Sequence, residues 1–197
     1  MSQRRTSALA MAVLLGVTAA WGSTFFMIRD LLVRVPVLDF LALRFALAAL
    51  VMFLIAPRSV TGMGREAARH AVVLGVLYGL GQILQTAGLA HTSASISGFI
   101  TGMYVVATPI FASWLLRTAI PALTWVAVAL ATAGLGVLAL QGLSIGYGEL
   151  ITLVAAMLYA LHIVGLGAWS KPDRALGMSI VQIAVIALIC FLVTIPD

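Results

Sequence analysis

The sequence predicts an all-α fold, a polytopic bundle of about seven transmembrane helices, and three observations support this fold class. The chain is 63% apolar and 9% charged, with a mean hydropathy of +1.17, whereas soluble domains are about 45–50% apolar and about 25% charged. Several apolar runs reach the roughly 20 residues that a helix needs to cross the hydrocarbon core. The links between these runs are short and contain glycine and proline. A single water-soluble globule is therefore excluded.

Seven apolar stretches are long enough to span a membrane, and their short links require neighbouring helices to run antiparallel. Transmembrane barrel strands would instead alternate in polarity over segments of about ten residues, and these runs do not. The expected spans are residues 8–28, 38–56, 70–90, 94–116, 121–140, 148–168 and 177–195.

The first stretch has a second interpretation. It follows Arg4-Arg5 and contains three small residues at positions 18–20, an arrangement that resembles a cleavable signal peptide. The apolar run nevertheless continues to Ile28, which makes it long enough to span. We therefore interpret it as the first transmembrane helix.

The later stretches each carry a recognisable feature. The second contains Arg44, and the fourth contains Pro109, which removes one backbone hydrogen bond and predicts a kink. The third is rich in glycine. The fifth, sixth and seventh are separated by turn residues at 141–142 and 170–173.

Flanking charges predict the orientation, because cytoplasmic loops of membrane proteins carry an excess of lysine and arginine. With Arg44 set aside inside a span, an inside N-terminus leaves only Arg29 and Arg34 facing outward. The cytoplasmic side then carries Arg4, Arg5, Arg58, Arg65, Arg69, Arg117, Lys171 and Arg174. This bias predicts a multi-pass protein of the cell (inner or plasma) membrane, with a cytoplasmic N-terminus and Asp197 outside.

Residue usage disfavours several function classes. The single cysteine, Cys190, rules out an internal disulfide and a cysteine-rich metal cluster, and the three histidines show no ligand spacing. The net charge of +5 comes from basic residues scattered between apolar runs, not from a surface suited to nucleic acid. Phosphate loops, nucleophile elbows and clustered acid–histidine sites are missing from the sequence. We expect no enzymatic activity, no cofactor, no metal and no nucleic-acid partner.

A weak internal repeat is visible. A shift of 138 positions lays residues 9–54 on residues 147–192 without gaps, and pairs Trp21 with Tyr159 and Arg44 with Gln182. The repeat unit would contain five spans, an odd number, so a second copy would enter the membrane from the opposite side. Such inverted repeats are common in secondary transporters.

Six segments carry a resemblance to a known family. They are residues 20–25 (AWGSTF), 43–50 (LRFALAAL), 84–95 (LQTAGLAHTSAS), 98–106 (GFITGMYVV), 115–117 (LLR) and 148–150 (GEL). In order and spacing they resemble the EamA-like branch of the drug/metabolite transporter superfamily, over nearly the whole chain.

The resemblance implies ten helices in two five-helix repeats around a central cavity, and transport of small metabolites without ATP hydrolysis. We expect residues 1–141 to form the first repeat and residues 142–197 the first two helices of the second. Either missing C-terminal helices or a homodimer would then complete the cavity within the lipid bilayer. The expected function is secondary transport of small organic metabolites, such as amino-acid-like compounds or drugs, with efflux by alternating access. The alternative is a membrane assembly subunit or inactive fragment that does not transport by itself.

Polar and aromatic side chains inside spans are candidates for the substrate site, because polar groups in hydrocarbon are costly unless they are paired or face a cavity. The candidates are Trp21, Arg44, Gln82, Gln85, Tyr104, Tyr159, His162 and Gln182. Helix packing with the polar tip bonded to a neighbour is the alternative for the aromatic residues, and an interhelical hydrogen bond is the alternative for His162. Arg44 would contact an anionic group of the substrate, or else reach outward and pair with Asp39 or Asp30.

Hinge or gate candidates lie in the fourth span. Pro109 would supply the kink. Gly98 and Gly102 form a small-xxx-small pair, and so do Gly75 and Gly79 in the third span. Such pairs favour close helix packing and permit helices to slide.

Overall fold

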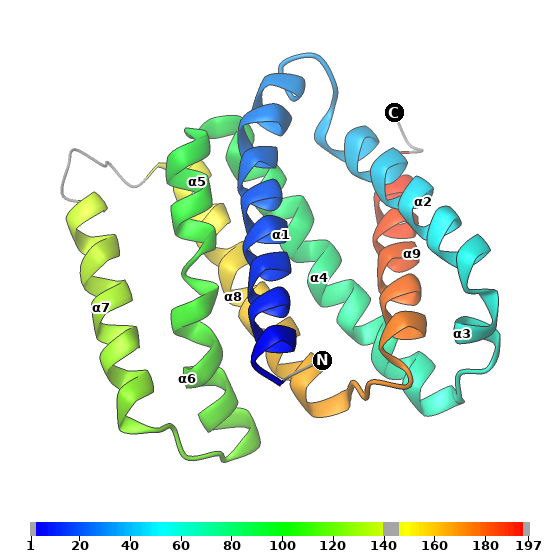
Figure 1. The fold of residues 1–197 in the computed structure, drawn as a ribbon. Coiled ribbons are helices and arrows are strands. Elements are labelled where there is room, and N and C mark those ends of the chain that lie inside the picture. Colours follow the sequence, from blue (N-terminus) through cyan, green and yellow to red (C-terminus); the bar gives the residue numbers. More distant parts are fainter. Residues whose placement is uncertain (1–2, 140–145, 195–197) are drawn as a thin grey trace.

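The computed structural model describes residues 3–139 and 146–194, and every regular element among them is a helix (Figure 1). The elements are α1 (Gln3–Leu31), α2 (Val37–Ile55), α3 (Pro57–Thr61), α4 (Arg65–His91), α5 (Ala94–Thr101), α6 (Tyr104–Leu116), α7 (Ala122–Ala139), α8 (Tyr147–Trp169) and α9 (Ala175–Thr194). The expected ends of the fifth and seventh spans, Leu140 and Ile195, lie outside the described residues. So do Asp197 and the expected domain boundary after residue 141.

The all-α polytopic fold class is confirmed. Among the described residues, six stretches are long and apolar enough to cross a membrane, and Ala122–Gly134 is a shorter apolar helix. The six stretches are Leu9–Leu31, Val37–Ile55, Arg65–His91, Ala94–Leu116, Tyr147–Trp169 and Ala175–Thr194. The fourth is built from α5 and α6 together.

Local chemistry explains several helix ends. Pro57 occupies the first turn of α3, where its missing N–H has no consequence. Ser93 caps α5 by accepting a hydrogen bond from the Ile96 N–H at 3.1 Å. At the start of α8, the Glu149 carboxylate accepts a bond from the Gly146 N–H at 3.0 Å and another from the Thr92 hydroxyl. Glu149 therefore joins the start of α8 to the link between α4 and α5.

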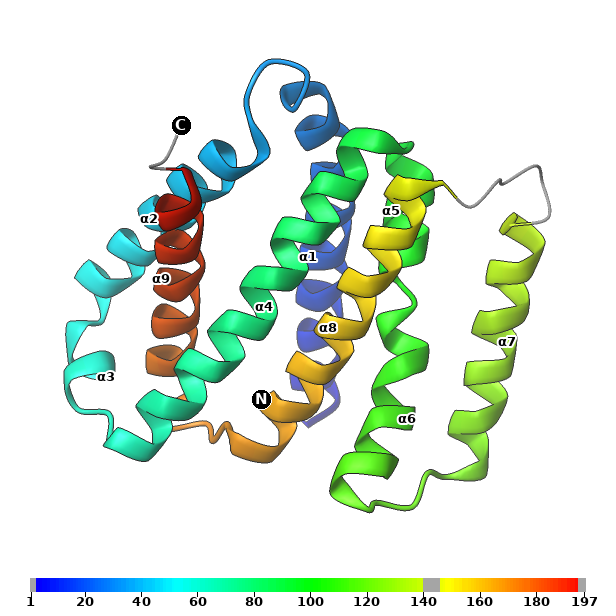
Figure 2. The same ribbon diagram turned by 180° about the vertical axis from the view of Figure 1, so that it is seen from behind.

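The centre of the molecule is α4, which packs between α8 and α9 (Figure 2). Its glycines permit both contacts. A Cβ on Gly75 would lie 2.9 Å from the Val185 Cβ of α9, and one on Gly81 would lie 2.7 Å from the Tyr159 ring of α8. A Cβ on Gly88 would overlap the Thr152 hydroxyl of α8. Different faces of one helix thus bring two neighbours to van der Waals contact, as small residues do in membrane bundles.

A second packed unit joins α2 to α9. Its buried side chains are Leu41, Ala42, Phe45, Ile186, Ala187 and Cys190. Because hydrocarbon tails are as apolar as these side chains, the contact is stabilised by close packing more than by removal of apolar surface from water.

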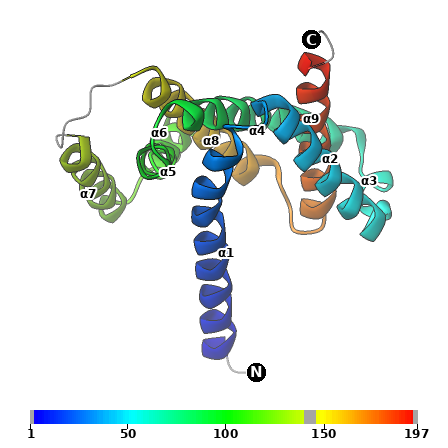
Figure 3. The same ribbon diagram turned by 90° about the horizontal axis from the view of Figure 1, so that it is seen from above.

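In contrast, the described side chains of α1 that are buried or half-buried against the bundle lie in its C-terminal half. Phe25 is 5% exposed, whereas Leu14 and Leu15 are 65% and 71% exposed. Seen from above, most of α1 projects away from the other helices (Figure 3). The outer apolar side chains of α1 are therefore suited to contact with lipid.

The fourth span is interrupted at Gly102 and Met103, between α5 and α6. The Met103 N–H bonds to Ile100 O at 3.0 Å and the Val105 N–H bonds to Gly102 O at 3.0 Å, so the regular bonds four residues apart are locally replaced by tighter turns. By contrast, α6 continues through Pro109. The break therefore lies N-terminal to the position where the proline predicts a kink.

The helices of the expected repeat run in opposite directions. Figure 1 shows α1 rising and α8 descending, and α2 descending and α9 rising. An inverted repeat requires this relationship between corresponding helices.

Candidate functional site

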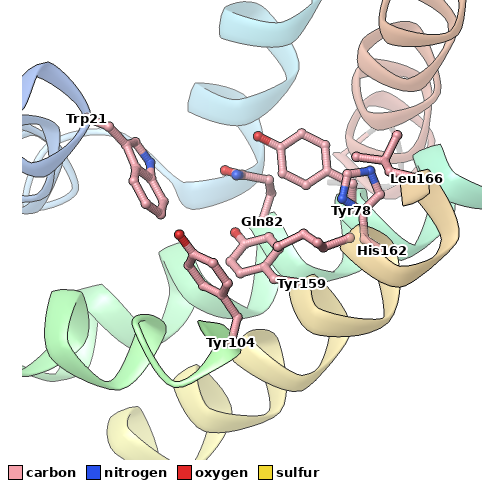
Figure 4. A pocket seen from close by; sticks show the side chains of 8 residues that line it. Trp21, Tyr78, Gln82, Tyr104, Tyr159, His162 and Leu166 are labelled. Carbon is pink, nitrogen blue, oxygen red and sulfur yellow. The ribbon is translucent and has the colours of Figure 1, made fainter. Parts of the chain in front are cut away.

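A cavity of about 240 Å³ lies between α1, α4, α6 and α8, and its walls are largely aromatic (Figure 4). It is lined by Trp21, Tyr78, Gln82, Tyr104, Tyr159, His162, Ile163 and Leu166. The four helices carry these residues at the middle of the spans, at the depth where secondary transporters bind substrate.

One side of the cavity is formed by Trp21 of α1 and Tyr104 of α6. Their ring centroids are 6.4 Å apart with an interplanar angle of 49°. Trp21 also meets Phe25 edge to face at 5.9 Å, within the range in which aromatic rings attract one another. Tyr104 is the first residue of α6, so the break in the fourth span adjoins the cavity.

The opposite side is formed by Tyr78 and His162, whose rings stack at 4.9 Å and 17°. The His162 ring nitrogen Nε2 lies 2.6 Å from the Gln182 Oε1 of α9, which is the interhelical hydrogen bond that the sequence offered as one alternative. Between the two sides, the Tyr159 hydroxyl donates to Gln85 Oε1 at 2.9 Å. Tyr159 and His162 therefore each have a hydrogen-bond partner on another helix and also line the cavity.

A much smaller cavity adjoins the first and shares Trp21 and Gln82 with it. Arg44 and Gln85 are among its lining residues. The guanidinium carbon of Arg44 lies 5.3 Å from the Phe45 ring centroid and 5.8 Å from that of Phe40, distances at which a cation is attracted to a ring.

The alternative pairing of Arg44 with Asp39 or Asp30 is not found: in the described part of the chain, neither carboxylate forms an ion pair with Arg44. The Arg44 guanidinium lies over the rings of Phe40 and Phe45 instead. Within the described residues, the arginine charge thus has no counter-ion beside the aromatic cavity.

The structure brings most of the sequence candidates together. Five of them line the larger cavity, Arg44 and Gln85 line only the smaller one, and Gln182 lines neither but bonds to His162. The sequence candidates omitted Tyr78, Ile163 and Leu166. Tyr78 lies one turn before Gln82 on α4, and that spacing was the available signal. Whether any of these residues binds substrate stays a prediction.

The hinge candidates lie outside the lining of either cavity. A Cβ on Gly98 would lie 3.8 Å from the Phe25 ring, an ordinary contact between α5 and α1. The nearest heavy atom to a Cβ on Gly102 would be the Phe99 carbonyl oxygen of its own span, at 3.0 Å.

The side chains that line the cavity are suited to binding a small molecule and offer few groups for covalent chemistry. It contains ring faces, amide groups and phenolic hydroxyls, and no carboxylate. Within the described ranges, no group of three His, Cys, Asp or Glu side chains is arranged to hold a metal ion. A polytopic helical bundle with an aromatic and amide-lined cavity at mid-span is the arrangement of a membrane carrier.

Comparison with known families agrees with this class. A model of the EamA-like transporter family matches residues 8–140. The match covers well over half of the chain, so the protein belongs to the EamA-like transporter family and is a membrane transporter of the drug/metabolite transporter type. No curated protein and no solved structure matches the chain.

Proposed function

We propose that this chain carries small amphipathic organic molecules, such as amino-acid-like compounds with an apolar or ring-shaped part, by secondary transport in the efflux direction across the cell membrane. The observation that supports the proposal is the aromatic and amide lining of the mid-span cavity. The absence of enzymatic activity is part of the same proposal.

The size of the cavity favours a small metabolite. Its volume of about 240 Å³ lies below the roughly 300–1,000 Å³ typical of sites for drug-sized ligands. The four aromatic side chains that line it would enclose an apolar or ring-shaped group.

The charges favour a substrate with an anionic or polar end. No acidic side chain lines the larger cavity, and Arg44 lines the adjoining one without a carboxylate partner in the described residues. An anionic end directed toward Arg44 would gain a charge-assisted hydrogen bond. The apolar part would stay between Trp21 and Tyr104.

Movement of the fourth span would supply alternating access. Its break at Gly102 and Met103 adjoins Tyr104, so a change in the angle between α5 and α6 would open or close one side of the cavity. The opposite directions of α1 and α8, and of α2 and α9, support the inverted repeat on which this mechanism rests.

Flux measured in proteoliposomes tests the proposal. Radiolabelled amino acids and small aromatic acids serve as probes, with and without an imposed proton gradient. We expect saturable flux of at least one probe, and Trp21→Ala should lower its kcat/KM by about tenfold, equivalent to about 1.4 kcal/mol. Trp114→Ala is the matched control, because Trp114 is 75% exposed and lines neither cavity.

Two outcomes would contradict the proposal. Equal losses in Trp21→Ala and Trp114→Ala would remove the cavity as the transport site. Absence of saturable flux for every probe would favour the alternative of an assembly subunit that does not transport by itself.

A further inference from the structure

A third cavity shares no lining residue with the other two and lies at the end of the bundle where α1 begins. Its volume is about 550 Å³, and it is bounded by α3, the first turn of α4 and the link between α8 and α9. Figure 2 shows these three segments gathered at one end of the molecule. By the orientation expected from the flanking charges, this end is cytoplasmic.

Three arginines from separate segments line this cavity. They are Arg58 of α3, Arg65 of α4 and Arg174 of the link before α9. The Arg174 Nε lies 3.4 Å from the Asp173 Oδ2, so these two side chains form an ion pair. Arg58 and Arg65 form no ion pair with any carboxylate in the described residues, so two guanidinium groups are available at the same cavity.

The wall that carries Arg58 is held firmly. The segment around Ser59 rests directly on the first turns of α9, because Gly177 is buried and a Cβ there would overlap the Ser59 carbonyl. Pro57 begins α3, and the Gly62 N–H bonds to Arg58 O at 3.0 Å. The backbone that carries the first guanidinium is therefore fixed against α9.

The start of α4 adds backbone donors to the same cavity. Gly64 is its N-cap and supplies no side-chain hydrogen bond, and the first backbone bond of the helix runs from the Ala68 N–H to Gly64 O at 3.0 Å. The preceding N–H groups, of Arg65, Glu66 and Ala67, belong to residues that line the cavity. Unbonded N–H groups at a helix start attract anions.

Two acidic residues, Glu66 and Asp173, also line the cavity. Asp173 is engaged by Arg174, and Glu66 lies in the first turn of α4, where a carboxylate is favourable. Arginine outnumbers carboxylate, so the cavity keeps a net positive character.

We infer that this cavity binds an anionic phosphate ester, either the headgroup of an anionic phospholipid or a soluble organic phosphate. Guanidinium groups bind phosphate oxygens through two parallel hydrogen bonds. Leu54 and Ile55 end α2 and Leu176 lies in the first turn of α9, close in sequence to the lining residues Arg58 and Arg174, and they are 68%, 78% and 47% exposed. They offer an apolar surface next to the charged one, which suits a lipid whose headgroup occupies a basic site between transmembrane helices.

Native mass spectrometry of the detergent-solubilised chain tests the inference. The probes are dioleoyl-phosphatidylglycerol, dioleoyl-phosphatidylcholine and sn-glycerol 3-phosphate. We compare Arg58→Gln/Arg65→Gln with the equal-charge control Arg69→Gln/Lys171→Gln, whose two residues are exposed and lie outside the cavity lining. Circular dichroism checks that both variants keep the wild-type helix content.

We expect the wild type and the control to bind phosphatidylglycerol saturably and at least about tenfold more tightly than phosphatidylcholine, and Arg58→Gln/Arg65→Gln to lose about tenfold in affinity. Such a factor corresponds to about 1.4 kcal/mol. Competition by sn-glycerol 3-phosphate at similar concentration would assign the site to a soluble phosphate ester, and failure to compete would assign it to the lipid headgroup. Equal binding by the two double variants, or no saturable binding of phosphatidylglycerol or glycerol phosphate by the wild type, would overturn the inference.

Discussion

Two pairs of buried polar side chains join neighbouring helices. The Tyr159 hydroxyl donates to Gln85 at 2.9 Å, and His162 bonds to Gln182 at 2.6 Å. An unpaired polar group in the hydrocarbon region is costly, and such interhelical bonds stabilise membrane bundles by about 0.6 kcal/mol on average. These pairs therefore link α8 to α4 and to α9, and both Tyr159 and His162 also line the cavity.

Gly88 is the residue whose enlargement should cost most at the crossing of α4 and α8. In Gly88→Ala the new Cβ would overlap the Thr152 hydroxyl and lie 2.7 Å from Gly148 O. Overpacking of this kind costs about 1–3 kcal/mol, so we expect a lower apparent Tm in detergent, followed by circular dichroism. Adding Thr152→Ala should recover part of the loss, because it removes one of the two overlaps.

Gly22→Ala is the matched control, because no heavy atom lies within 4 Å of a Cβ at that position. Alanine is favoured over glycine inside a helix by roughly 0.5–1 kcal/mol, so this variant should melt at the wild-type temperature or slightly higher. A Gly88→Ala protein as stable as Gly22→Ala would show that the two helices do not cross this closely.

At the scale of the element, the fourth span differs from its neighbours because it is divided. Both halves pack against α8: Ser97 and Thr101 of α5 are buried, and so are Val106 and Ala107 of α6, whereas Val105 is 58% exposed. The proposed gate therefore requires α6 to change its angle to α5 at the break while it moves against α8.

We predict that Gly102→Ala slows transport. Alanine stabilises a continuous helix by roughly 0.5–1 kcal/mol relative to glycine, and that energy corresponds to a factor of about two to five in the population of a bent span. Flux in proteoliposomes should fall by about this factor. The variant should fold normally, because Gly102 has right-handed helical dihedral angles, φ −55° and ψ −16°.

Gly98→Ala provides the comparison within the same span. Its Cβ would make only an ordinary contact with Phe25, at 3.8 Å, and the residue lies inside α5. Its flux should match the wild type, and Pro109→Ala should also have little effect, because α6 continues through that position. Equal slowing by Gly98→Ala and Gly102→Ala would assign the effect to glycine loss in general instead of to the break.

At the scale of the whole molecule, the loops divide between two ends of the bundle. The link after α1 and the link between α4 and α5 lie at one end, and α3 and the link between α8 and α9 lie at the other (Figure 1). The excess of basic residues at the second end predicts that it faces the cytoplasm.

Cysteine labelling in intact cells checks this orientation. Val33→Cys, at a position 85% exposed, should react with a membrane-impermeant maleimide, whereas Lys171→Cys should react only after the cells are lysed. The native Cys190 is buried and should contribute little background labelling. The reverse pattern would place the N-terminus outside and invert the predicted topology.

Much of the fold could be predicted from the sequence, and less of the site. The six spans match the expected stretches to within a few residues, because length and hydropathy are local properties of the chain. Trp21, Tyr104 and Tyr159 could be proposed for one cavity from their mid-span positions alone. Tyr78 was omitted, because a residue at the right spacing shows only which face it shares with Gln82 and not which helix covers that face.

The sequence by itself determined that this protein is a helical membrane protein, where its spans lie and which side chains are polar within them. Only the tertiary structure decided which of those side chains meet, because the crossings of α4 with α8 and α9 depend on contacts between residues far apart in the chain. Gly75 and Gly79 look like Gly81 and Gly88 in sequence, yet the first two contact α9 and the second two contact α8. The sequence offered Gly98, Gly102 and Pro109 as hinge candidates, and only the folded chain decided that the span divides at residues 102–103 while α6 continues through Pro109.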